Sequence, residues 1–302
     1  MNIIRLKGGI GNQLFQYAFG CAQKENEITV KYDISSFEGY RHAFRLKYFN
    51  VDIENENTDL FTKTKPFKPW FQGSKNIFKK VLKRFSIYFE DIFYIKRKVI
   101  YSRKSYDSRL LKVDNKFFDG YWANSKYFQN VLPSLRKDVC IRQEFYNYDY
   151  SELRKKIEQS TTPVVSIHIR KGDYLWEENT KIFEEISLDY YYKSLDFIYK
   201  RIGEFTLFIF SNDIDWCKTN FKYNKTIVFI DDNYTLEDYH EFELMRLCNH
   251  NIIANSTFSW WAAYLNNNSD KIVIAPRIWY ANESRQKKHE RNGFIPEDWI
   301  RL

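Results

Sequence analysis

The second half of the chain repeats one pattern, in which a short run of β-branched and aromatic residues is followed by a longer amphipathic stretch. Short buried strands that alternate with helices are typical of a parallel sheet with helices on both faces. The pattern therefore predicts an α/β fold whose C-terminal half is a doubly wound parallel sheet. Strands are expected at residues 164–170, 206–211, 226–230, 251–254 and 271–275, and the clearest helices at 187–202 and 236–249.

The N-terminus begins with a βαβ pattern of its own. Residues 2–6 are expected to form a strand, residues 7–12 (KGGIGN) a glycine loop, residues 13–23 a helix, and residues 28–32 a second strand. Bare backbone amides and a helix N-terminus make such a loop a cradle for an anion or a sugar, although a tight turn without any ligand fits equally well. The loop is not a dinucleotide fingerprint, because Leu14 stands where the third glycine would be.

Polar side chains follow three strands of the predicted C-terminal sheet. Ligands of doubly wound sheets bind at the carboxyl ends of the strands, where arginine can hold diphosphate oxygens bidentately and a helix start can bind phosphate. The pattern favours a phosphorylated ligand, and solvated charges with ordinary helix caps are the alternative. The residues are His168, Arg170, Lys171 and Asp173 after the first strand, Asn212 and Asp213 after the second, and Asn255, Ser256 and Thr257 after the fourth.

Asp213 admits two interpretations. Its carboxylate can accept both the ring N–H and the exocyclic amine of guanine, which uracil lacks. Asp213 and Asp215 also spell DxD, a pattern by which many sugar transferases hold a divalent metal. Because Arg170 and Lys171 could neutralise a diphosphate by themselves, we favour the interpretation without metal.

Composition restricts the class of protein. The chain has 302 residues, of which 44% are hydrophobic and 19% aromatic, and it contains no apolar run near the roughly 20 residues of a spanning helix. No signal peptide pattern precedes residue 13, so we expect a cytoplasmic protein.

The length suits two domains, at 1–155 and 156–302, with the polar stretch at 148–162 as the boundary. The four cysteines are widely spaced and are expected to be reduced thiols.

The positive charge is regional. Residues 63–104 hold thirteen lysines and arginines against Glu90 and Asp91, an excess larger than the +8 of the whole chain. Interleaved aromatic residues make this region a candidate contact with the anionic inner face of a membrane or with an acidic glycan, and a solvated basic face is the alternative. No nucleic-acid motif accompanies it. Residues 117–128 (FFDGYWANSKYF) predict a strand and a loop that line a sugar-sized groove or pack in the core.

Five segments together resemble the bacterial α-1,2-fucosyltransferases, in the order of that family and over nearly the whole chain. The family usually carries two arginines in HxRRxD, and Lys171 takes the place of the second here, which keeps the charge but loses a fork of donors. The segments are GGIGNQLFQYAFG (8–20), DGYWANSKYF (119–128), SIHIRKGDYL (166–175), IFSNDIDW (209–216) and HNIIANSTFSWWAAYL (250–265).

The resemblance implies a GT-B fold, in which two Rossmann-like domains face a cleft, with an N-terminal acceptor side and a C-terminal domain that binds GDP-fucose. It implies inverting transfer of fucose, without metal or other cofactor, to a hydroxyl of an oligosaccharide or lipid-linked glycan, most simply the 2-hydroxyl of a terminal galactose. The implied catalytic residues are Arg170 and Asn12. Asp173, the carboxylate of the same motif, is the first choice for the base, and a salt bridge by which it positions Arg170 or Lys171 is the alternative. Glu177 and Glu178, which match no segment of the family, are the reserve bases. The implied donor-binding residues are Gly11, Gln13, His168, Lys171, Asp213, Asn255, Ser256, Thr257 and Phe258.

Other functions remain open at this point. A fucosyltransferase of another linkage, or a transferase of another GDP-sugar, would carry the same motifs. A glycan- or membrane-binding protein without activity would explain the basic region at 63–104 but would leave the three polar strand ends without a purpose.

Overall fold

The computed structural model describes residues 1–39, 42–55, 98–101, 106–171 and 182–302. The chain divides into two compact units. The first unit comprises residues 1–7, 15–43 and 53–131, and the second unit comprises residues 8–14, 44–52 and 132–302. The glycine loop thus belongs to the second unit, although it lies at the N-terminus of the chain.

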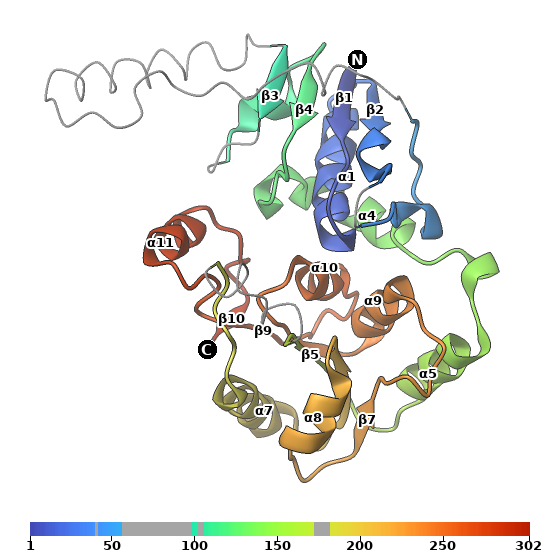
Figure 1. The fold of residues 1–302 in the computed structure, drawn as a ribbon, viewed down its shortest axis with the longest axis vertical. Helices are drawn as coiled ribbons and strands as arrows, with labels where there is room; N and C mark the ends of the chain where they lie inside the picture. The colour runs from blue at the N-terminus through green and yellow to red at the C-terminus, as the bar shows by residue number, and fades with distance from the viewer. Residues whose placement is uncertain (40–41, 56–97, 102–105, 172–181) are drawn as a thin grey trace, which may run out of the picture. The chain divides into compact units, whose positions relative to one another are not determined.

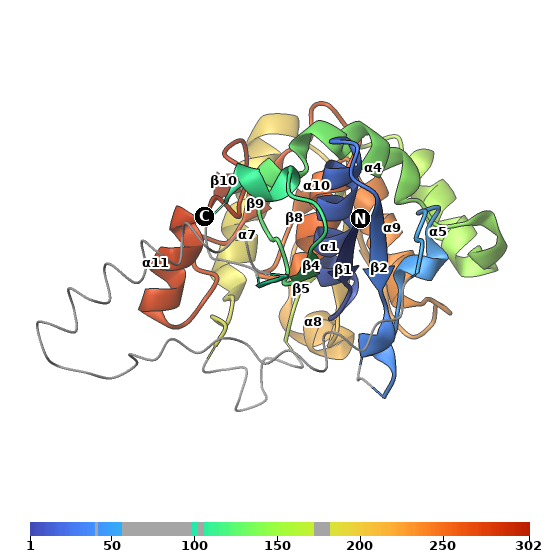
Figure 2. The same ribbon diagram turned by 90° about the horizontal axis from the view of Figure 1, so that it is seen from above.

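The first unit contains a four-stranded parallel sheet in the order β2-β1-β4-β3 (Figure 1). The rings of Phe19 and Phe118 pack edge to face, with their centroids 5.2 Å apart, so helix α1 packs on the sheet through aromatic residues. β1 and β2 lie side by side in register, which confirms the predicted βαβ start (Figure 2). The elements are β1 (Asn2–Arg5), α1 (Ile10–Lys24), β2 (Val30–Asp33), β3 (Val99–Tyr101) and β4 (Phe117–Asp119).

The second unit contains a six-stranded sheet in the order β10-β9-β8-β5-β6-β7, and every pair in it is parallel. β5 is an inner strand whose six residues are all buried. From β5 the chain adds strands first on one side and then on the other, so the strand order reverses between β5 and β8. The strands are β5 (Val164–Ile169), β6 (Thr206–Ser211), β7 (Ile227–Phe229), β8 (His250–Ile252), β9 (Val273–Ala275) and β10 (Ile300–Arg301).

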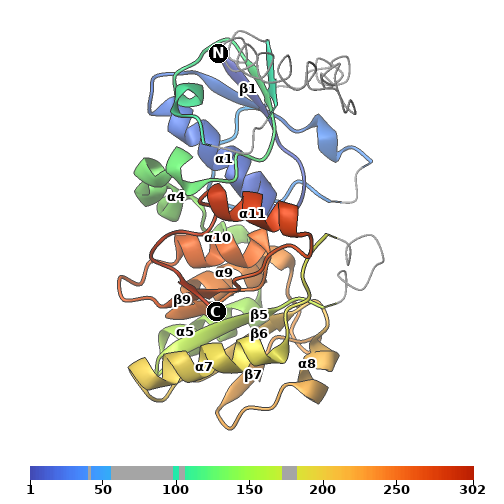
Figure 3. The same ribbon diagram turned by 90° about the vertical axis from the view of Figure 1, so that its left-hand side faces the viewer.

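Helices cover both faces of this sheet (Figure 3). α7 and α8 pack on one face, and α9 and α10 lie beside each other on the other face, where α5 contacts α9 and α4 contacts α10. This arrangement confirms the predicted doubly wound α/β fold. The helices are α4 (Leu132–Asp138), α5 (Tyr148–Glu158), α7 (Leu188–Ile202), α8 (Ile214–Asn220), α9 (Asp238–Leu247), α10 (Thr257–Leu265) and α11 (Glu283–Arg291).

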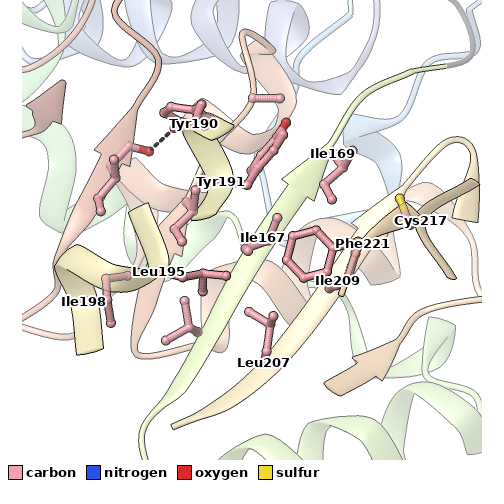
Figure 4. Packing of buried hydrophobic residues seen from close by; sticks show 14 of the residues in the cluster. Ile167, Ile169, Tyr190, Tyr191, Leu195, Ile198, Leu207, Ile209, Cys217 and Phe221 are labelled. Atoms are coloured by element: carbon pink, nitrogen blue, oxygen red, sulfur yellow. Dashed lines mark hydrogen bonds between the residues drawn. The ribbon is translucent and has the colours of Figure 1, made fainter. Parts of the chain in front are cut away.

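One hydrophobic core of the second unit lies under α7 (Figure 4). Ile167 and Ile169 of β5 meet Tyr191 and Leu195 of α7, and all four are buried. The Tyr190 hydroxyl donates to the carbonyls of Ile253 (2.8 Å) and Ile274 (3.0 Å), which satisfies its buried oxygen. This core holds the carboxyl ends of β5 and β8 in place.

Element boundaries differ from the sequence-based expectation mainly at α1, which begins at Ile10 rather than Gln13. The glycine motif therefore includes both the loop before α1 and the first turn of α1. The division between the compact units falls at Val131 and Leu132, so α5 belongs to the second unit. The boundary near residue 155 and the cleft of a GT-B fold stay predictions.

Several expectations concern residues outside the described ranges. Asp173, Glu177 and Glu178 are among them, as is most of the basic region at 63–104. None of the four cysteines is in a disulfide, and Cys217 and Cys248 are buried. None of the described helices combines the length and the apolar character needed to cross a membrane.

Candidate functional site

The carboxyl ends of β5 and β8 meet at the point of strand reversal, where doubly wound folds bind their ligands. His168, near the end of β5, is 9% exposed, and a hydrogen bond of 2.9 Å joins its Nδ1 to Ser259 Oγ in α10. The His168 ring also lies 5.8 Å from the Phe258 ring. Arg170, half-buried, follows β5 directly. The strand end and the first turn of α10 are therefore held together by side chains.

Ser256 is the N-cap of α10. Its hydroxyl accepts a hydrogen bond of 3.3 Å from the Phe258 backbone N–H, which is the ordinary capping role. Thr257 and Phe258 are partly exposed, whereas Asn255 is buried, and its Nδ2 donates to the carbonyls of Glu184 (2.8 Å) and Trp279 (3.0 Å). Asn255 thus holds the loop before α10 in place. The partly exposed groups at the start of α10 belong to Thr257 and Phe258.

The glycine loop packs against the start of α10. A Cβ atom on Gly11 would overlap the backbone carbonyl of Thr257, so only glycine fits this close approach. The structure thereby brings together two motifs from opposite ends of the sequence. Asn12, the next residue of α1, is half-buried, and its side chain makes no hydrogen bond to another described residue.

Gln13 has a different role from its neighbour. It is fully buried; its Nε2 donates to the Gly8 carbonyl (2.7 Å), and its Oε1 accepts from the Arg45 backbone N–H (2.9 Å). The Arg45 guanidinium in turn pairs with Asp238 of α9 at 3.0 Å. Gln13 therefore fastens the glycine loop to segment 44–52, and Arg45 fastens that segment to α9.

Lys171 is held by partners that the sequence did not predict. Its ammonium pairs with Glu185 and lies 4.2 Å from the centroid of the Trp216 ring. Its backbone N–H donates to Asn212 Oδ1 at 2.9 Å. No spacing along the chain relates Lys171 to Glu185, so sequence reasoning had no signal for the pair, whereas Trp216 lies in a quoted motif. The ion pair with Glu185 compensates the charge of Lys171, which makes Lys171 a weaker candidate for binding a diphosphate.

The two carboxylates of the DxD sequence lie in different environments. Asp213 is the N-cap of α8, and its Oδ1 accepts from the Trp216 backbone N–H at 3.1 Å. The Asp215 side chain is 91% exposed, and its Oδ1 lies 4.0 Å from Lys218 Nζ. One carboxylate caps a helix and the other faces solvent.

Glu241 is a candidate that the sequence analysis missed. It lies early in α9, where a carboxylate normally profits from the helix dipole. Burial, together with the smaller effect of the nearby Asp238 charge, instead raises the pKa of Glu241 to about 7. α9 and α10 begin at the same edge of the sheet, and the Phe242 ring next to Glu241 lies 5.6 Å from the Phe258 ring. Glu241 is therefore the chain neighbour of a residue whose ring contacts the start of α10.

Comparisons with known proteins cover the whole chain. The family model described as Glycosyl transferase family 11 matches residues 1–302. The chain is 34% identical to an alpha-1,2-colitosyltransferase of Escherichia coli, over 99% of this chain and 98% of the relative. It is 28% identical to the O-antigen biosynthesis glycosyltransferase WbnK of Escherichia coli, over 98% and 99%. A galactoside alpha-(1,2)-fucosyltransferase 2 of Rattus norvegicus is 26% identical over 61% of this chain and 52% of the relative.

Proposed function

The chain belongs to glycosyl transferase family 11, and we propose that it transfers L-fucose from GDP-fucose to the 2-hydroxyl of a terminal galactose in an oligosaccharide or lipid-linked glycan. The transfer inverts the anomeric centre and needs no metal ion. Relatives named for α-1,2 transfer of colitose and of fucose support the linkage. GDP-colitose is the second candidate donor, because the colitosyltransferase matches the full chain at 34% identity. Colitose is fucose without the 3-hydroxyl, so one site can suit either sugar.

The observation that carries the donor half of the proposal is the close approach of Gly11 to Thr257. Asn12 is the next residue of α1, and the first two side chains of α10 are partly exposed. Backbone N–H groups at a helix start favour the phosphates of a nucleotide, and a carboxamide suits the hydroxyls of a sugar. Arg170, which follows the neighbouring strand, supplies the fixed positive charge.

These groups suit a single displacement. As the acceptor hydroxyl attacks C1 and the bond to GDP breaks, negative charge grows on the leaving phosphate oxygen. Arg170 and the amides of the first turn of α10 act on that charge, and their fixed orientation costs no reorganisation during the reaction. Ser256 and the His168–Ser259 hydrogen bond keep the turn in place. Asn12 orients the sugar, and Asp213 remains the proposed partner of guanine.

The base that removes the acceptor proton is proposed to be Asp173, which lies directly after Gly172 in the motif. Among the described carboxyls, Glu241 is the alternative, because its pKa of about 7 suits proton abstraction at neutral pH. The pH dependence of turnover separates the two. Loss of activity in Asp173→Asn with a retained profile in Glu241→Gln supports Asp173, and the reverse supports Glu241.

Calorimetric binding of GDP and UDP in EDTA, with wild type and Arg170→Ala, tests the donor site. We expect selective binding of GDP without metal and weaker binding in the variant. Preference for UDP, or an absolute need for a divalent ion, would contradict the proposal and would favour a metal at Asp213 and Asp215. Transfer assays with GDP-fucose and GDP-colitose on a β-galactoside then identify the sugar and the linkage.

A further inference from the structure

The first unit has a polar strand edge that the donor site does not use. β1 and β4 are neighbours, and the strand order reverses between them, because β2 lies on one side of β1 and β4 and β3 lie on the other. Such a reversal creates a natural ligand position at the carboxyl ends of the two strands. Lys7 follows β1, and Asp119 ends β4. Their side chains form an ion pair, and Arg5 Nη1 lies 3.6 Å from the second oxygen of Asp119.

An aromatic side chain stands next to this pair. Tyr121 is 41% exposed, and its ring centroid lies 5.4 Å from Lys7 Nζ. The next residue, Trp122, is 3% exposed and has φ +53°, in the left-handed region that a bulky residue rarely adopts. The Trp122 ring stacks on Phe19 at 4.7 Å. Packing of the Trp122 ring in the core thus stabilises the strained backbone at this residue. Because of this turn, the preceding Tyr121 lies at the surface.

One buried side chain connects the two strand ends. Gln16 of α1 is fully buried; its Oε1 accepts from the Lys7 backbone N–H (2.9 Å), and its Nε2 donates to the Gly120 carbonyl (3.1 Å). These bonds fix the backbone on both sides of Tyr121 and Lys7. The surface is therefore rigid, which a binding site requires and an incidental exposed tyrosine does not.

We propose that Tyr121, Asp119 and Lys7 form a subsite for one pyranose of the acceptor glycan. The Tyr121 ring stacks against a C–H face of the sugar, Asp119 accepts hydrogen bonds from two neighbouring hydroxyls, and Lys7 donates to a third oxygen. A neutral ligand fits, because Lys7 and Arg5 already compensate the Asp119 carboxylate, and that carboxylate would repel a phosphate. The subsite rests on the proposed function for the identity of its ligand.

The chain itself links this subsite to the donor site. Lys7 is the last residue before the chain passes from the first unit into the glycine loop of the second unit. Four peptide bonds beyond Gly8, the same loop carries Asn12. An acceptor sugar held by Lys7 is thereby connected through a short backbone segment to the residue proposed to orient the donor sugar.

The test combines acceptor kinetics with direct binding. Tyr121→Ala and Asp119→Asn are each expected to raise the acceptor KM for lactose about 10-fold, the change that a loss of one good contact produces, while GDP affinity and Tm stay at wild-type values. Tyr121→Phe keeps the ring and should keep KM. Tyr148→Ala is the matched control, because Tyr148 is also exposed (78%) but lies at the start of α5 in the second unit.

Saturation-transfer NMR with lactose and methyl β-galactoside, without donor, keeps the two proposals separate. If wild type binds lactose through Tyr121 but transfers no sugar from GDP-fucose or GDP-colitose, the proposed function fails and the subsite stands. If transfer proceeds with an unchanged acceptor KM in Tyr121→Ala, the subsite is wrong and the function stands. Absence of both binding and transfer would overturn both.

Discussion

The carboxyl edges of the two sheets carry different kinds of group. In the second unit, side chains that look available in the sequence bind to the protein itself: Asn255 to two carbonyls, Lys171 to Glu185, and Asp213 to its own helix. In the first unit, the exposed group is a large aromatic side chain beside a compensated carboxylate. At the edge of the second unit, the polar side chains named here bond within the protein, whereas the edge of the first unit exposes an aromatic side chain to solvent.

Under the proposed function, the difference corresponds to two chemical tasks. A diphosphate that gains charge during the reaction is best stabilised by dipoles that are already fixed, and we propose that the polar side chains of the second unit serve mainly to fix them. A neutral sugar needs a flat apolar face and a few hydrogen bonds, which exposed side chains supply. Changes at the second unit should therefore alter turnover most, and changes at the first unit should alter acceptor affinity.

The largest effect is expected for Arg170→Ala, the fixed charge of the second unit's edge. Turnover with GDP-fucose should fall about 10²- to 10³-fold, as is typical for the loss of one donor aimed at developing charge. Arg201→Ala, at an exposed position of α7, is the control and should keep turnover. Near-normal turnover of Arg170→Ala would show that the leaving group is stabilised elsewhere.

Two glycines of the same helix sharpen the comparison. Gly11→Ala would push the backbone of Thr257 in the second unit, and Gly20→Ala would push the Tyr32 hydroxyl in the first unit. Both should lower the free energy of unfolding by about 1–3 kcal/mol through overpacking. Only Gly11→Ala should also weaken GDP binding, by about 10-fold or more in calorimetry. Equal GDP affinity in the two variants would break the link between the glycine loop and the donor.

The amides of Asn12 and Gln13 provide a finer test. Gln13→Leu leaves the buried Gly8 carbonyl and Arg45 N–H without their partner, so it should lower the free energy of unfolding by about 1–3 kcal/mol. Asn12→Ala should leave the stability within about 0.5 kcal/mol but reduce kcat, because Asn12 has no structural partner among the described residues. Urea unfolding and steady-state kinetics measure the two effects, and a stability loss in Asn12→Ala would contradict the assignment.

The last prediction concerns the pH dependence of stability at Glu241, where no loss of turnover is needed for the test. Because burial raises its pKa from 4.5 to about 7, the native state binds the proton more tightly, and stability falls as pH rises between these values. Glu241→Gln should remove that loss and be more stable than wild type above pH 7, by about 1–3 kcal/mol. Asp215→Asn, at an exposed position, changes the net charge equally and serves as control. Identical profiles of wild type and Glu241→Gln would show that Glu241 does not titrate near neutrality.

The strands of the second sheet were predictable because a buried parallel strand is a continuous apolar run with its boundaries in the sequence. Residues 206–211 match β6 fully, and residues 164–170 exceed β5 by one. The location of the polar edge was predictable, because the strand order brings the carboxyl ends of β5 and β8 together. Its internal bonding was not, because Lys171 with Glu185 and His168 with Ser259 are tertiary pairs without a local signal.

The first unit shows the same limit in a different form. The aromatic stretch at 117–128 indicated a strand and a loop, and β4 confirms the strand. The left-handed Trp122 that leaves Tyr121 exposed had no sequence signal, because such a conformation is expected at glycine or asparagine. The glycine loop indicated a cradle, but the reason Gly11 must be glycine lies in Thr257, far away in the chain.

That contact has a consequence for synthesis on the ribosome. Gly11 is synthesised well before its packing partner Thr257, because the two residues lie far apart in the sequence. At about 5–20 residues per second, many seconds pass between the synthesis of the glycine loop and the synthesis of the start of α10. We expect nascent chains that end before α10 to bind no GDP, so that the growing polypeptide stays inactive until α10 has been made.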